Sequence, residues 1–122
     1  MKVALTVWEN RISPVFDSTR MLLIVNIENR GVAEKQYVPF DCDSPFSRAA
    51  KLDDLGAGVL ICGAISNSFA NLIEVRNIRI IPFIAGAVDE VIEAYLMGTP
   101  ISKKFRMPGY GTRQDEDLSE ED

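Results

Sequence analysis

A short apolar run, residues 59–62 (Val-Leu-Ile-Cys), constrains the fold of this chain more than any other feature. The run lies between Gly58 and Gly63 and contains no polar side chain. Strands of this kind are typical of the buried centre of a parallel sheet, where helices cover both faces. Because parallel strands need a crossover connection, the run predicts an α/β fold with helices on both sides of it in the sequence.

Three segments carry the helix signals that such a fold needs. A serine–proline pair at positions 44–45 suits an N-cap and the first helical position, and Gly56 suits the end of that helix. Ser66 or Asn67 can cap a second helix. A third helix ends before Gly98, and its apolar residues recur at helical spacing. Those residues are Val88, Val91, Ile92, Tyr95 and Leu96.

The N-terminal third of the chain predicts antiparallel strands. Residues 3–8 are rich in β formers, residues 21–27 form an almost continuous apolar run, and residues 32–38 alternate. A turn joins the last two runs into a hairpin, because Asn29 and Gly31 tolerate positive φ.

A final strand is predicted at residues 78–83, which gives the order β-β-β-α-β-α-β-α. The simplest assembly is one mixed five-stranded sheet with helices packed on its faces. We expect residues 3–8 to lie between the hairpin and the parallel strand at residues 59–62.

The charge of the chain is concentrated at its C-terminal end. The formal net charge is −5, yet residues 1–112 carry 12 acidic and 12 basic side chains. We expect a folded domain over residues 1–98, an extension over residues 99–112 and a disordered acidic tail over residues 113–122. The tail suits either solubility or docking of a basic partner. A neutral body argues against nucleic-acid binding.

The sequence predicts a cytoplasmic protein. No apolar run approaches the roughly 20 residues that span a bilayer. The first residues enter strand-like sequence directly and show no signal-peptide pattern. We therefore expect no membrane partner.

The chain has no histidine and two cysteines, which excludes several kinds of chemistry. Without a CxxC pair or a histidine, neither a zinc finger nor a Ser-His-Asp set can form within one chain. The commonest general base is also missing, so we expect a protein that is not an enzyme. Cys62 ends an apolar strand and suits either a buried hydrophobe or a functional thiol. Cys42 lies just before a predicted helix, where it suits a reactive thiol or an ordinary loop residue.

Ligands of open α/β sheets bind beyond the carboxyl ends of the strands, and two segments converge there. One follows the first strand at residues 11–17, and the other follows the central strand at residues 62–67. Gly63 would permit close backbone approach, or it serves only a tight strand-to-helix turn. The start of the following helix offers amide groups to an anion.

Four pieces of sequence, together with this architecture, resemble the dinitrogenase iron–molybdenum cofactor-binding family. Their order and spacing match over residues 1–98. That family includes nitrogenase cofactor carriers, accessory proteins and small homologues in bacteria and archaea. The pieces are Met1-Lys2-Val3-Ala4, Ser13-Pro14-Val15-Phe16, residues 60–65 (Leu-Ile-Cys-Gly-Ala-Ile), and residues 87–98.

The resemblance implies a ribonuclease H-like fold and a surface that binds a metal cluster. It places Ser13, Pro14 and Phe16 of one loop, and Gly63, Ala64 and Ile65 of the next, along that surface. An iron–sulfur or molybdenum-containing cluster is anionic and thiophilic, so backbone amides with Cys42 or Cys62 as thiolate ligands would suit it.

The leading hypothesis is therefore a non-enzymatic carrier of such a cluster, with a cluster donor or acceptor protein as partner. The alternative is a regulatory or scaffolding module that binds a protein through its tail or hairpin, without bound metal. A nuclease site would need several carboxylates at strand ends. The first strand offers only Glu9 there, and the parallel strand offers none.

Overall fold

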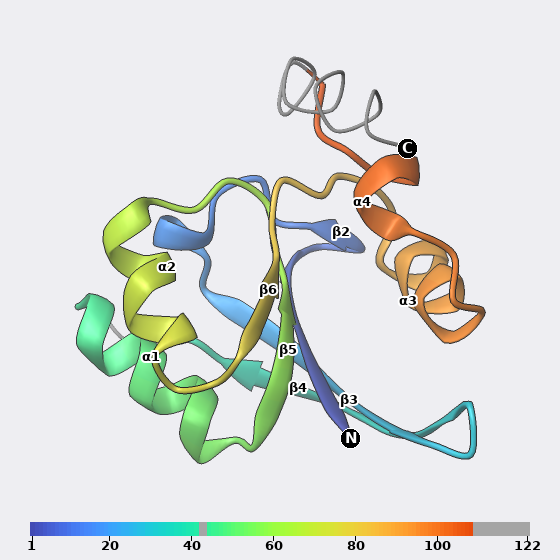
Figure 1. Ribbon diagram of the computed structural model, residues 1–122, viewed down its shortest axis with the longest axis horizontal. Coiled ribbons are helices and arrows are strands. Elements are labelled where there is room, and N and C mark those ends of the chain that lie inside the picture. The colour runs from blue at the N-terminus through green and yellow to red at the C-terminus, as the bar shows by residue number, and fades with distance from the viewer. Residues whose placement is uncertain (42–43, 109–122) are drawn as a thin grey trace.

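The computed structural model describes residues 1–41 and 44–108 as one mixed sheet with helices on both faces (Figure 1). The strand order is β4-β3-β1-β5-β6, with a short strand, β2, paired to β1 outside this path. The β1–β3 and β3–β4 pairs are antiparallel, and the β1–β5 and β5–β6 pairs are parallel. The bounds are β1 Lys2–Trp8, β2 Arg11–Ile12, β3 Met21–Glu28, β4 Gly31–Pro39, β5 Ala57–Ile61 and β6 Arg79–Ile81.

This arrangement confirms the α/β class and the position of β1 between the hairpin and β5. The expected strand count of five was wrong, because β2 adds a sixth strand where a loop was expected. Glu9 takes a positive φ of 58°, so the chain reverses immediately after Trp8. The register then pairs Trp8 with Arg11. The ribonuclease H-like classification stays a prediction.

The β3–β4 hairpin closes at a two-residue turn with an unexpected residue in it. Asn29 and Arg30 carry the positive φ values, 53° and 63°, whereas Gly31 begins β4. The turn was predicted correctly, but the left-handed position assigned to Gly31 falls on Arg30. A two-residue hairpin loop of type I′ needs positive φ at both loop residues, whatever side chains they carry.

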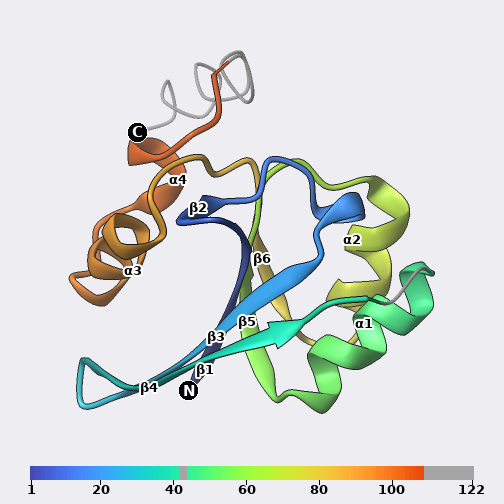
Figure 2. The same cartoon turned by 180° about the vertical axis from the view of Figure 1, so that it is seen from behind.

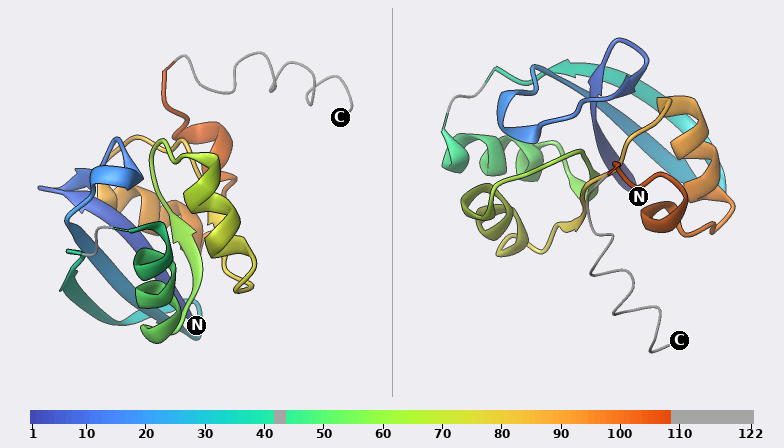
Figure 3. Two further views of the ribbon diagram at one scale, coloured as in Figure 1. Left: turned by 90° about the vertical axis from the view of Figure 1, so that its left-hand side faces the viewer. Right: turned by 90° about the horizontal axis from the view of Figure 1, so that it is seen from above.

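Helices α1 (Pro45–Asp54) and α2 (Asn67–Glu74) cover one face of the sheet, and α3 (Val88–Leu96) covers the other. Figures 2 and 3 show the strands between these two layers. The α1 helix begins with the predicted cap, where the hydroxyl of Ser44 accepts a hydrogen bond from the amide of Ser47 at 3.0 Å. Two apolar cores result, one on each face, and each stabilises the sheet by removing apolar surface from water.

The segment after α3 packs against the body. A short helix, α4 (Ile101–Lys104), buries Ile101 in the α3-side core. The amide of Ala85 donates to the carbonyl of Phe105 at 2.6 Å, and the amide of Met107 donates to the carbonyl of Phe83 at 2.8 Å. These two hydrogen bonds attach the loop that follows β6 to the segment after α4. That strand is shorter than expected, because Pro82 has no amide to donate and Phe83 takes a φ of 62°.

Across residues 1–41 and 44–108, no helix combines the length and apolar character needed to span a membrane. The expected tail, residues 113–122, lies outside the described residues. The division at residue 98 and the cytoplasmic location stay predictions.

Candidate functional site

The two segments expected to converge at the carboxyl ends of the strands cross each other there. Residues 13–16, here called the crossing segment, pass over the turn between β5 and α2 (the upper edge in Figure 1). The amide of Ala64 donates to the carbonyl of Pro14 at 2.8 Å, and the amide of Phe16 donates to the carbonyl of Ala64 at 2.7 Å. A further bond, from the amide of Ser13 to the carbonyl of Thr6 at 2.9 Å, fixes the crossing segment to β1.

Gly63 explains why this crossing is possible. A Cβ built on Gly63 would lie 2.5 Å from the carbonyl oxygen of Ser13 and 2.6 Å from the carbonyl carbon of Pro14. Real Cβ atoms essentially never stand this close to a backbone atom. The backbone of Ser13 and Pro14 therefore occupies the space that the missing Cβ of Gly63 leaves open. This backbone covers Gly63, which is buried.

Phe16 anchors the crossing segment from below. Its ring is fully buried and meets the rings of Phe40 and Phe69 edge-on, at centroid distances of 5.6 and 5.4 Å. Because the ring is enclosed, Phe16 positions the loop through the core and presents no side-chain surface to a ligand.

Arg48 is a positioning residue that the sequence analysis missed. Its side chain extends from α1, is only 3% exposed, and donates to the carbonyl of Phe16 at 2.9 Å. The guanidinium also lies over the ring of Phe40, 4.5 Å from its centroid. A basic residue four positions after the Ser44 cap looks like an ordinary solvated helix residue, so nothing in the sequence signals its burial.

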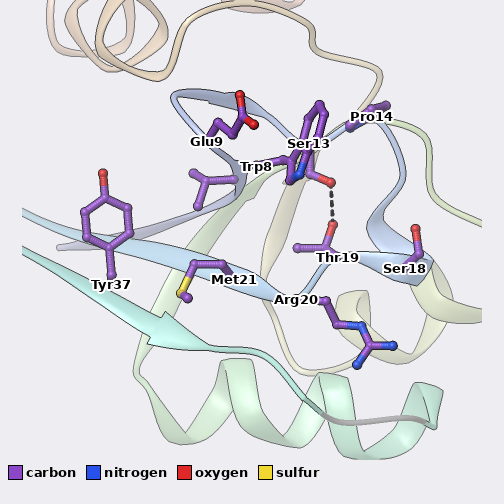
Figure 4. A pocket seen from close by; sticks show the side chains of 10 residues that line it. Trp8, Glu9, Ser13, Pro14, Ser18, Thr19, Arg20, Met21 and Tyr37 are labelled. Carbon is purple, nitrogen blue, oxygen red and sulfur yellow. Dashed lines mark hydrogen bonds between the residues drawn. The ribbon is translucent and has the colours of Figure 1, made fainter.

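The crossing segment separates two open clefts. The hairpin-side cleft has a volume of about 570 Å³ and lies between the crossing segment and the β3–β4 hairpin (Figure 4). The helix-side cleft has a volume of about 380 Å³ and lies toward the start of α2. Both volumes fall within the range of small-ligand sites. The helix-side cleft is lined by Val15, Asp17, Ala64, Ile65, Ser66 and Phe83.

The hairpin-side cleft is mainly apolar and aromatic. Trp8 and Tyr37 line it and are 62% and 60% exposed, and Met21 lies beside Tyr37 on the neighbouring strand (Figure 4). Ser13 also belongs to this cleft, and its hydroxyl lies 3.0 Å from that of Thr19. Pro14 lies exposed at the same rim.

The helix-side cleft contains the predicted anion-binding helix start, together with a carboxylate. Ser66 is the N-cap of α2, but its side chain makes no capping hydrogen bond. The amide of Ser66 donates instead to Asp17 Oδ1 at 3.3 Å. Ala64 and Ile65 form the wall beside it. The amide groups that could hold an anion are therefore present, with the Asp17 carboxylate at their edge.

The sequence offers two thiols as metal ligands, Cys62 and Cys42. The Cys62 side chain is fully buried on the α1–α2 face, and burial, with a smaller contribution from Asp17, raises its pKa to about 12. A neutral, enclosed thiol is a poor metal ligand. Cys42 lies outside the described residues. Within those residues, no group of three or more carboxylate, thiol or imidazole side chains is placed to hold a metal ion.

The fold and these clefts define an α/β domain with two clefts at the carboxyl ends of its parallel strands. The chain belongs to the dinitrogenase iron–molybdenum cofactor family, whose sequence profile matches residues 1–98. This match confirms the family resemblance seen in the sequence. No curated protein gives a significant match.

Solved structures share the fold at low sequence identity. The crystal structure of PH0822 has a TM-score of 0.76 at 21% identity, covering 81% of this chain and 93% of that one. A candidate dinitrogenase (mj0327) from Methanocaldococcus jannaschii has been solved twice. Its crystal structure gives a TM-score of 0.63 at 23% identity, covering 80% of this chain and 89% of that one. Its NMR structure gives 0.68 at 22% identity, covering 89% and 93%.

Proposed function

We propose that this protein is a non-enzymatic carrier of an anionic iron–sulfur or molybdenum-containing cluster, which it binds in the helix-side cleft and passes between a donor and an acceptor protein. The observation that carries the proposal is the crossing of two segments that both lie in the family-matched region, beside the start of α2. Ala64 and Ile65, which line this cleft, take the binding role that the family resemblance implies for them.

The chemistry of the cleft suits an anion held mainly by hydrogen bonds. The start of α2 supplies amides that have no partner within the helix, and Ser66, the N-cap residue, lines the same cleft. Asp17 opposes this attraction, and an anionic cargo would have to displace its single 3.3 Å bond to Ser66. Cys42 is proposed as a thiolate ligand of the cluster, and this role rests on the sequence alone.

A pair of matched valine variants tests the site. Val15 lines the helix-side cleft and is 42% exposed, whereas Val75, 76% exposed, caps the far end of α2. Each variant is incubated with isolated iron–molybdenum cofactor without oxygen and passed through a gel-filtration column. Molybdenum and iron should co-elute with the wild-type protein and with V75E, and should be lost from V15E. Equal retention by both variants would place the cargo elsewhere, and no retention by the wild type would contradict the carrier function.

A second function, docking of a protein partner without metal, is favoured by the hairpin-side cleft. Its exposed Trp8, Met21 and Tyr37 are residue types enriched at the centres of protein interfaces. In this case W8A and Y37A would abolish capture of the partner, and V15E would leave it unchanged.

A further inference from the structure

The hairpin-side cleft carries three kinds of side chain in order along its length: aromatic, hydroxyl and basic (Figure 4). Tyr37 lies at one end and pairs with Leu23 of β3. Arg20 lies at the other end, three residues before Leu23 in the chain. Because a strand rises about 3.4 Å per residue, the two ends are roughly 10 Å apart along the sheet. The cleft therefore suits an elongated molecule whose two ends differ chemically.

The aromatic end exposes ring surface that the folded domain does not use. Trp8 and Tyr37 are 62% and 60% exposed, and Met21 lies on β3, the strand between theirs. Among the described residues, neither apolar core includes any of the three. An apolar floor with aromatic side chains on two sides favours stacking of a flat ring system.

The middle of the cleft contains a buried hydroxyl with hydrogen-bonding capacity to spare. Ser13 is 7% exposed and Thr19 is 2% exposed. The single hydroxyl proton of Thr19 has two acceptors within reach, the carbonyl of Val15 at 2.8 Å and the hydroxyl of Ser13 at 3.0 Å. Whichever acceptor takes it, the Ser13 oxygen keeps an acceptor position, and its side chain makes no other hydrogen bond within the described part of the chain. A hydroxyl group of a ligand can donate to it.

The basic end offers a guanidinium to an anion. The side chain of Arg20 is exposed and makes no ion pair or hydrogen bond with any described residue. Its backbone is fixed, because its carbonyl accepts from the amide of Phe40 at 2.9 Å. A guanidinium matches the geometry of a phosphate group. Glu9 also lines the cleft, but it follows Trp8 at the aromatic end, where its carboxylate can accept from the amino group of a ring.

We propose that the hairpin-side cleft binds a purine nucleoside monophosphate. The base lies over Trp8, Met21 and Tyr37, the ribose hydroxyls meet Ser13, and the phosphate meets Arg20. One guanidinium matches a single nucleotide, whereas a nucleic-acid backbone needs a series of basic side chains. A purine, the larger of the two base types, covers more of the apolar floor. This site is independent of the proposed carrier function, which uses the cleft on the other side of the crossing segment.

Calorimetric titration with AMP and adenosine, which differ only in the phosphate, tests the assignment. The wild-type protein should bind both, and AMP more tightly. W8A should weaken binding of both ligands by roughly tenfold, because base stacking on an aromatic ring is lost. R20Q should weaken binding of AMP by roughly fivefold and leave adenosine unchanged, because only AMP presents a phosphate to the guanidinium.

Two exposed residues outside the cleft provide matched controls. Phe46, 64% exposed, lies on α1, and Arg79 is exposed on β6 at the other edge of the sheet. F46A and R79Q should bind AMP as the wild type does. Equal losses in W8A and F46A, or an equal loss of AMP and adenosine binding in R20Q, would overturn the proposal. A wild-type protein that binds neither AMP nor adenosine would also overturn it, and would leave this cleft to a protein partner.

Discussion

Gly63 lies against the backbone of Ser13, so closely that a Cβ on the glycine would stand 2.5 Å from the serine carbonyl oxygen. This contact joins the loop after β2 to the loop after β5. The hydrogen bond from the amide of Ala64 to the carbonyl of Pro14 also connects the two loops. The clefts on either side exist because this crossing holds the loops above the sheet.

The crossing makes alanine at position 63 strongly unfavourable. G63A should lower the free energy of unfolding by about 1–3 kcal/mol, because backbone atoms must move to admit the methyl group. Gly58 is the control, since a Cβ there would lie 3.9 Å from the carbonyl of Lys2 and meets no crowding. Urea denaturation of both variants measures the difference. Similar unfolding midpoints for G63A and G58A would show that the crossing can relax.

We expect Asp17 to limit the affinity of the helix-side cleft for anions. D17N removes a negative charge beside the start of α2 and keeps an oxygen that can accept from Ser66. We expect tetrathiomolybdate to bind roughly fivefold or more tightly, which corresponds to about 1 kcal/mol. D54N, at the far end of α1, changes the net charge equally and should have little effect. Equal gains in the two variants would mean that only net charge matters.

Cys62 should make the folded protein less stable at alkaline pH. Its pKa is raised to about 12, so above the ordinary thiol value, near 9, the unfolded chain loses a proton that the folded chain keeps. Stability from this group is complete below pH 9 and falls as pH rises toward 12, by up to about 1.4 kcal/mol per pH unit. Thermal unfolding of wild type and C62A from pH 8 to 11 isolates the effect. Parallel curves for the two proteins would contradict the raised pKa.

The two thiols should differ in reactivity. Burial keeps Cys62 neutral and enclosed, so iodoacetamide should modify it only at the rate of unfolding. Cys42 is expected from the sequence to react faster, and to be protected by bound cluster. C42S should weaken cluster retention more than S13A does. Mass spectrometry of the modified protein measures both rates. Unchanged cluster affinity in a variant that lacks both thiols would leave backbone amides as the sole ligands.

The hairpin turn can be improved by one substitution. Arg30 carries a φ of 63°, which glycine adopts without strain, and Asn-Gly is the preferred pair in such turns. R30G should therefore raise the free energy of unfolding by about 0.5–1 kcal/mol. A chemical denaturation curve measures the gain. Destabilisation would mean that the arginine side chain contributes more than its backbone strain removes.

Strand patterns predicted most of the sheet because they depend on residue types that the sequence displays. The apolar run at residues 59–62 and the hairpin were placed correctly, and with them the central position of β1. The second strand was missed because it has two residues and depends on Glu9 accepting a left-handed backbone. A glutamate gives no sign that it will do so.

The candidate site was predicted in outline and missed in detail. The two converging loops follow from strand direction, which the sequence reveals. The roles of Gly63 and Arg48 depend instead on contacts between segments far apart in the chain. Such contacts leave no local pattern: a glycine pressed against a distant loop and a buried arginine look the same in the sequence as a turn and a surface charge.

Paramagnetic line broadening tests the central claim, that the cargo binds in the helix-side cleft. Isolated iron–molybdenum cofactor, which is paramagnetic, is added without oxygen to the ¹⁵N-labelled protein, and amide resonances near the cluster lose intensity. The account predicts selective loss at Val15, Ile65, Ser66 and Phe83, with Trp8 and Tyr37 retained. Loss at Trp8 and Tyr37 alone, or an unchanged spectrum, would contradict it.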